Sequence, residues 1–120
     1  MTIPSKKYDI ADRTLNFARS IRQLIKTLPR TLTNIEDGKQ LTRSSGSVGA
    51  NYLEACEALS KKDFLMRLKI SRKEARESAY WLELIQVEAT QNLIHQDLLS
   101  EARQLVKIFT AIIIKTEQRN

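Results

Sequence analysis

The chain of 120 residues has few of the residues that make turns, crosslinks and metal sites. Three glycines and two prolines are too few for a sandwich or barrel of many short strands. A single cysteine cannot form an internal disulfide, so nothing argues for secretion. No apolar run approaches the roughly 18 residues of a membrane helix, and the N-terminus lacks a hydrophobic signal segment. We therefore expect one cytoplasmic domain over residues 1–120, without a membrane partner.

Apolar residues in this chain recur at intervals of three and four, which keeps them on one helix face. The spacing predicts four helices, over about residues 6–28, 34–59, 61–90 and 95–118. Asn34 is the expected N-cap of the second helix. Ser60 followed by Asp63 resembles a capping box at the start of the third. Connections this short join antiparallel neighbours, so we expect an all-α fold, an up-down-up-down antiparallel four-helix bundle.

The second predicted helix contains small residues at positions where larger ones would favour a helix. Gly46 and Gly49 lie in its interior, and each such glycine costs about 1 kcal/mol relative to alanine. We interpret both as sites of close helix packing. The backbone-clamping loop of a KH domain is the alternative, but no strand pattern accompanies it. The inward face of this helix includes Leu41, Val48, Tyr52 and Leu59.

The third predicted helix has a second apolar arc, roughly 200–260° around the helix from Phe64. A helix in an isolated bundle buries one stripe, so a second arc favours an oligomer contact. Scattered surface hydrophobes are the alternative. The arc consists of Met66, Ile70, Trp81 and Leu84.

Basic residues form two stripes in a chain whose net charge is +6. Binding to the phosphate backbone of RNA or DNA is one interpretation, and a solvated face with i,i+4 ion pairs is the other. Base-specific recognition is not predicted, because no aromatic residues interleave with the basic ones. The stripes are Arg19, Arg22, Lys26 and Arg30 on the first helix, and Lys62, Lys69, Lys73 and Arg76 on the third; Lys39 and Arg43 are further candidates.

Residues suited to catalysis or metal binding are scarce. The only histidine, His95, lacks the paired Glu-x-x-His partner of di-iron bundles. Cys56 lies on the inner side of its helix and is expected to pack as a small hydrophobe rather than act as a nucleophile. No phosphate loop or dinucleotide fingerprint is present. We expect no catalytic residue, no metal, no cofactor and no enzymatic activity.

Two motifs point to a family. The first is SSGSVGANYLEA over residues 44–55, and the second combines SKKDF at 60–64, EARES at 74–78 and YWLEL at 80–84. Together they resemble a bacterial four-helix-bundle family that includes proteins encoded in intervening sequences of large-subunit ribosomal RNA genes. The resemblance covers nearly the whole chain. The same family includes accessory proteins of diversity-generating retroelements, which form barrel-shaped homopentamers, bind nucleic acid and associate with a reverse transcriptase.

The resemblance therefore implies a non-enzymatic, basic homopentamer that binds RNA or DNA, with a reverse transcriptase as a further partner. The alternative is a structural or scaffold oligomer from a ribosomal RNA intervening sequence, whose charge only keeps it in solution. A steep decrease of nucleic-acid binding with salt would separate the two.

Overall fold

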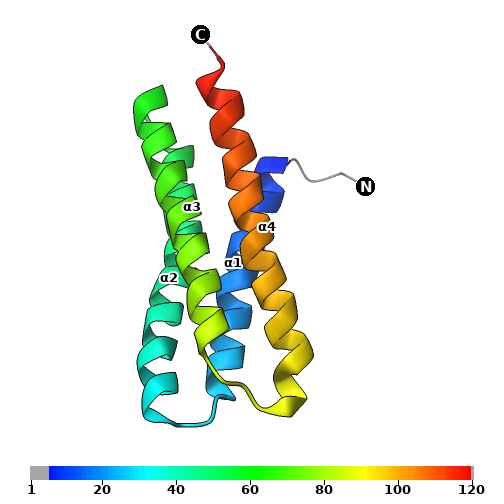
Figure 1. Cartoon of the computed structure of the whole chain (residues 1–120). Helices are drawn as coiled ribbons and strands as arrows, with labels where there is room; N and C mark the ends of the chain where they lie inside the picture. The colour runs from blue at the N-terminus through cyan, green and yellow to red at the C-terminus, as the bar shows by residue number, and fades with distance from the viewer. Residues whose placement is uncertain (1–5, 120) are drawn as a thin grey trace.

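Residues 6–119 fold into four long helices joined by short connections (Figure 1). The computed structural model describes the backbone of residues 6–119 and the side chains of residues 10–119. Each helix packs against the next along the chain, and α4 returns to α1, so the predicted up-down-up-down bundle is confirmed. The part of the chain that the structure describes contains no strand. The elements are α1 (Lys6–Lys26), α2 (Leu32–Cys56), α3 (Lys61–Leu84), the short 3-10 helix η1 (Ala89–Gln91) and α4 (Asn92–Glu117).

Side chains cap the starts of α2 and α3. Ser60 Oγ accepts a hydrogen bond from the backbone N–H of Asp63 at 3.0 Å, as the sequence predicts. At α2, however, the cap is Thr31, whose Oγ1 accepts from the Asn34 N–H at 3.2 Å. The N-cap therefore lies three residues before Asn34, and the prediction of Asn34 as the N-cap is wrong.

Asn34 instead joins two connections that are far apart in the sequence. Its side chain is buried, and its Nδ2 donates to the carbonyls of Pro29 and Gln86, both at 2.9 Å. Its Oδ1 accepts from the Gln86 N–H at 2.9 Å. Because both backbone groups of Gln86 are bound to this side chain, α3 ends at Leu84 and does not reach Thr90 as predicted.

The other helix ends also differ from the sequence pattern by a few residues. After α3 the chain runs extended through Ile85, forms η1, and starts α4 at Asn92 instead of His95. Helix α2 ends at Cys56, so Leu59 lies in the connection and is fully exposed, although the pattern placed it on the inward face. The interior is continuous along the bundle, and its largest fully buried side chains include Phe17, Leu41, Leu68, Leu105 and Phe109.

Small side chains let α2 approach its two neighbours. Toward α3, buried serines form the seam: the hydroxyls of Ser44 and Ser78 lie 2.9 Å apart, and Ser71 Oγ donates to the Val48 carbonyl at 2.9 Å. Toward α1, a Cβ added at Gly49 would lie only 2.9 Å from the Oγ1 of buried Thr14. Gly49 therefore sets how closely α1 can pack on α2.

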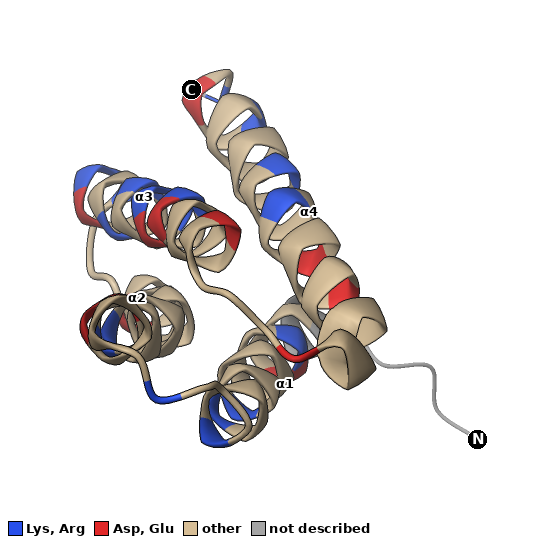
Figure 2. Ribbon diagram, turned by 60° about the horizontal axis from the view of Figure 1, so that its bottom comes forward, with Lys and Arg blue, Asp and Glu red and all other residues tan. Residues whose placement is uncertain are grey.

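Helix α4 is inclined to the other three helices (Figures 1 and 2). Near its C-terminal end it leaves a largely apolar cavity of about 970 Å³, whose lining includes Ile10, Tyr52, Cys56, Phe64 and Ile112. Burial raises the pKa of the Tyr52 phenol, and a hydrogen bond with Cys56 adds to this shift. Cys56 is thus part of the packed wall of the cavity.

Within residues 6–119, no helix combines the length and the apolar character needed to span a bilayer.

Candidate nucleic-acid interface

The four basic residues predicted as a stripe on the first helix lie on one exposed surface of the molecule. Arg19, Arg22 and Lys26 are on α1, and Arg30 is in the connection to α2. All four side chains are exposed. Among the side chains of residues 10–119, no carboxylate forms an ion pair with any of them. Their charge is therefore not neutralised within the described part of the protein.

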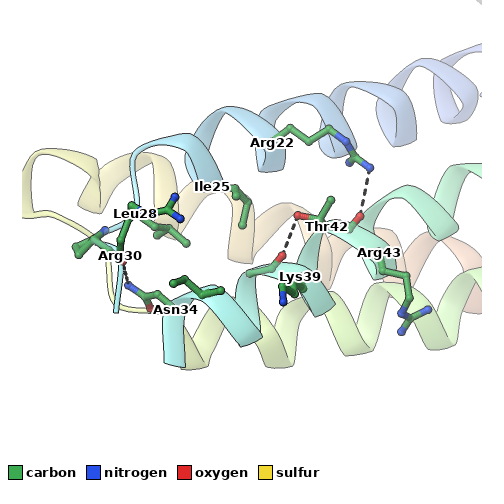
Figure 3. A pocket seen from close by; sticks show the side chains of 11 residues that line it. Arg22, Ile25, Leu28, Arg30, Asn34, Lys39, Thr42 and Arg43 are labelled. Carbon is green, nitrogen blue, oxygen red and sulfur yellow. Dashed lines mark hydrogen bonds between the residues drawn. The ribbon is translucent and has the colours of Figure 1, made fainter. Parts of the chain in front are cut away.

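Two members of this stripe border a hollow between α1 and α2, which we call the α1/α2 groove (Figure 3). Its volume is about 470 Å³. Ile25, Leu28 and Ile35 supply apolar wall, and none of the lining residues is acidic. The cations at the groove are Arg22, Arg30, Lys39 and Arg43.

Arg22 is held in place by two backbone carbonyls. Its Nη1 donates to the Ala18 carbonyl at 3.2 Å. Its Nη2 donates to the Thr42 carbonyl at 3.3 Å (Figure 3). A Cβ added at Gly46 would lie 3.2 Å from this Nη2. Gly46 thus makes room for the guanidinium of a basic-stripe residue, whereas Gly49 makes room for Thr14 of α1. A guanidinium that is already positioned gives up less conformational freedom when it binds a phosphate.

The two cations that α2 adds to the groove are partly neutralised. Lys39 Nζ lies 3.3 Å from a carboxylate oxygen of Glu36. Arg43 lies 3.4 Å from buried Glu74 and 3.3 Å from Glu77, both on α3. These carboxylates compete with phosphates for Lys39 and Arg43, whereas no carboxylate of the described residues pairs with Arg19, Arg22, Lys26 or Arg30. The α1 residues are accordingly the stronger candidates for phosphate contacts.

The second basic stripe has different surroundings. Lys62, Lys69, Lys73 and Arg76 are exposed on α3. Lys69 Nζ lies 3.3 Å from a carboxylate oxygen of Glu117 on α4. The three lysines of this stripe surround an apolar hollow of about 480 Å³ on a single helix. We call this surface the α3 outer face; it consists of Lys62, Leu65, Met66, Lys69, Ile70 and Lys73.

The α3 outer face therefore combines the three lysines of the predicted basic stripe with Met66 and Ile70 of the predicted oligomer contact. Met66 and Leu84 are 47% and 45% exposed, which leaves apolar area available to a partner. Helices α1 and α3 lie on opposite sides of the bundle (Figure 2). The two stripes consequently do not combine into one basic surface.

Trp81, the largest residue of the predicted oligomer contact, is partly buried against the core. It lies two turns after Glu74, on the side of α3 that meets Arg43 of α2. Its ring packs edge-on against Tyr80, with centroids 5.1 Å apart. Its Nε1 is buried and has no hydrogen-bond partner within the described residues. Trp81 thus differs from Met66 and Leu84, whose side chains are half exposed.

Residues considered for metal binding or catalysis serve structural contacts. His95 Nε2 lies 2.6 Å from the Leu82 carbonyl and joins the start of α4 to the end of α3. Cys56 forms a hydrogen bond with Tyr52 in the wall of the apolar cavity. Within the portion of the chain that the structure describes, no group of three His, Cys, Asp or Glu residues is placed to hold a metal ion.

Comparisons with known proteins agree with this helical architecture. A family model described as 23S rRNA-intervening sequence protein matches residues 6–111. Among solved structures, the chain is similar to a protein of unknown function from the S23 ribosomal protein family of Bacteroides thetaiotaomicron VPI-5482, with a TM-score of 0.76 and 32% sequence identity. That similarity covers 91% of this chain and 98% of the other. A comparison with curated proteins gives no match.

Proposed function

Because the chain belongs to the 23S rRNA-intervening sequence protein family, we propose that it is a non-enzymatic homo-oligomer that binds the phosphate backbone of RNA or DNA. The proposed contact surface is the α1/α2 groove together with Arg19 and Lys26 beside it. The observation that carries this proposal is the groove itself, which collects four cations and has no acidic residue in its lining.

The dimensions of the α1 stripe suit a short stretch of nucleic-acid backbone. Arg19 and Lys26 are seven residues apart on α1, which corresponds to about 10 Å along the helix. Phosphates on one strand of B-form DNA advance about 3.4 Å each along the axis, so the α1 residues could contact about three phosphates. Contacts of this kind are independent of base sequence, which agrees with the absence of stacking aromatics in the groove.

Oligomerisation would strengthen such weak contacts. Five copies at +6 each would carry a formal charge of +30. In an oligomer, every copy carries the same groove. Once one groove holds a nucleic-acid strand, the other grooves of the assembly meet that strand at a high effective concentration. We therefore include a homopentamer in the proposal, as the family resemblance implies. We also include a reverse transcriptase as protein partner, as in the retroelement accessory proteins of that family.

A salt titration tests the nucleic-acid part of the proposal. Labelled single-stranded RNA, single-stranded DNA and duplex DNA are titrated with protein while anisotropy is followed between 50 and 200 mM salt. We expect binding that depends little on sequence and that weakens steeply with salt, because each displaced phosphate counterion contributes to the slope. No binding at the lowest salt would contradict the proposal and favour the scaffold function.

The scaffold function also has structural support. Lys39, Arg43 and Lys69 each pair with a carboxylate of the same chain. Part of the positive charge therefore contributes to contacts within the bundle. Phosphate binding is favoured because the cations of the α1 stripe have no such partner in the described structure.

A further inference from the structure

The start of α4 forms an acidic and apolar end of the bundle. No Lys or Arg occurs between Ile85 and Ala102, whereas residues 61–76 contain seven. Glu88 and Asp97 are exposed, and neither forms an ion pair with a cation of the described residues. We call this surface the α4 acidic end; it consists of Glu88, Leu93, Ile94 and Asp97.

This end also exposes large apolar side chains. Leu93 is 80% exposed and Ile94 is 46% exposed. Two neighbouring apolar residues between free carboxylates are costly to leave in water, and a contact with a partner would bury them. A partner surface that is apolar at its centre and basic at its rim would complement this end.

The α3 outer face has these properties. Leu65, Met66 and Ile70 provide apolar lining for its hollow, and three lysines surround them. Lys62 and Lys73 have no carboxylate partner in the described part of the chain, so they remain available to pair with carboxylates. Exposed rim charges of this kind direct the register of a contact more than they add affinity.

The two surfaces cannot meet within one molecule. Met66 lies near the start of α3, and about 27 Å of helix separate it from Leu84 at the other end. Helix α4 starts at the end of the bundle where α3 finishes, so the α4 acidic end and the start of α3 lie at opposite ends of the bundle (Figure 1). Contact between these surfaces therefore requires two copies of the chain.

We propose that the α4 acidic end of one copy docks on the α3 outer face of the next. This inference rests on the proposed homo-oligomer and specifies its contact surfaces. The two patches are different, so the contact is heterologous: each copy keeps a free patch on either side until a ring closes. The lysines of α3 then contact carboxylates of a neighbouring copy, and the α1/α2 groove remains free for phosphates.

Disulfide trapping tests this arrangement. In a Cys56→Ser background, Met66→Cys and Leu93→Cys are introduced into the same chain, which is oxidised with copper phenanthroline and separated on a non-reducing gel. Each single-cysteine variant can form dimers at most, whereas the double variant should form a ladder of larger multimers. Peptide mass spectrometry should identify the link between positions 66 and 93.

The matched control places the second cysteine elsewhere. Leu53 on α2 is 57% exposed and lies outside both proposed surfaces. We expect the Met66→Cys/Leu93→Cys chain to crosslink about 100-fold faster than Met66→Cys/Leu53→Cys at 10 µM, because docking raises the effective thiol concentration to about millimolar. Equal rates for the two chains would overturn the inference.

Charge reversal provides an independent test. Lys62→Glu with Lys73→Glu should return the protein to its 13.8 kDa monomer mass in analytical ultracentrifugation. Glu88→Lys with Asp97→Lys should do the same, and all four changes in one chain should restore the assembly. These side chains are exposed, so the fold should tolerate each change. Failure of the fourfold variant to reassemble would count against the pairing.

The outcomes separate this inference from the proposed function. An oligomeric wild-type protein without links between positions 66 and 93 would overturn the docking arrangement alone. A monomeric wild-type protein would overturn both the docking and the homo-oligomer. The salt titration tests nucleic-acid binding by the α1/α2 groove separately, so neither result by itself overturns that part of the proposed function.

Discussion

The α1/α2 groove and the α3 outer face have similar basic residues but different surroundings. The groove lies between two helices, its lining contains no acidic residue, and Arg22 is positioned by two carbonyls. The α3 outer face lies on a single helix, where Lys62, Lys69 and Lys73 alternate with apolar side chains. One of these lysines, Lys69, already pairs with Glu117.

This difference shows that a stripe of Lys and Arg does not define a nucleic-acid site by itself. A cation contacts the phosphates of a nucleic acid well only when the protein's own carboxylates do not neutralise its charge. Basic residues around exposed apolar side chains are equally suited to a protein contact with an acidic rim. The apolar neighbours and the ion pairs distinguish the two cases, and both depend on tertiary structure.

The largest expected effect is on self-association, when a charged residue is introduced into the α3 outer face. Met66→Glu places a carboxylate in the apolar hollow, where it would remove apolar packing and repel Asp97 of the docked copy. Met66 is already about half buried, so docking it adds only about 1 kcal/mol. A carboxylate left without a partner in the apolar contact costs about 1–3 kcal/mol more, so the self-association constant should fall about 100-fold. Sedimentation equilibrium measures this change. Leu53→Glu, at an exposed site of α2, is the control and should leave the mass unchanged.

The next largest effect concerns the packing that builds the α1/α2 groove. Gly49→Leu should destabilise the fold by roughly 1–3 kcal/mol through overpacking, although leucine favours helix more than glycine does. The added side chain would collide with Thr14, which is buried and has little room to move. Urea unfolding measures the change. An unchanged or increased midpoint would show that α1 does not depend on close approach at this position.

A smaller effect is expected at the position beneath Arg22. Gly46→Ala should shift the free energy of unfolding by less than about 1 kcal/mol, because the helix gain of alanine offsets a contact with a flexible side chain. The added Cβ would lie 3.2 Å from Arg22 Nη2, so the guanidinium must move slightly. Nucleic-acid affinity should fall by about twofold or less. A large decrease in stability would mean that α2 packs on a rigid element here.

A similarly small effect on nucleic-acid binding should come from the second basic stripe. Changing Lys62, Lys69, Lys73 and Arg76 to Gln is done in the Met66→Glu monomer, so that altered assembly does not affect the result. Affinity for single-stranded RNA should change less than about threefold, because this face is assigned to a protein contact. A tenfold or greater decrease would place phosphates on α3.

The fold could be predicted well from the sequence because the helical spacing of apolar residues extends over four long segments. Single residues that depart from this spacing do not change the predicted fold. It failed at the ends of helices, where single tertiary contacts decide. Asn34 favours a cap by its residue type, yet it binds Gln86, which is 52 residues away, and thereby ends α3. Leu59 follows the heptad pattern but lies after the end of α2.

The candidate sites could be predicted only in part. Helical spacing placed Arg19, Arg22 and Lys26 on an exposed face, as the structure shows. The ion pair of Lys69 with Glu117 and that of Arg13 with Glu101 at 2.6 Å join residues from different helices. No spacing rule identifies such pairs. Asp97 is exposed and forms no ion pair with a cation of the described residues, so it is suitable as an acidic control in binding experiments.

The most direct test of the account is the salt dependence of RNA binding after Arg19, Arg22 and Lys26 are changed to Gln in the Met66→Glu monomer. Removing one cation from a single-strand phosphate should reduce the slope of log affinity against log salt by about 0.7, and removing three should reduce it by about 2. Asp97→Asn in the same background is the control and should leave the slope unchanged. The account predicts a shallower slope and about 10- to 100-fold weaker binding at 100 mM salt. An unchanged slope with unchanged affinity would contradict the assignment of the α1/α2 groove as the nucleic-acid interface.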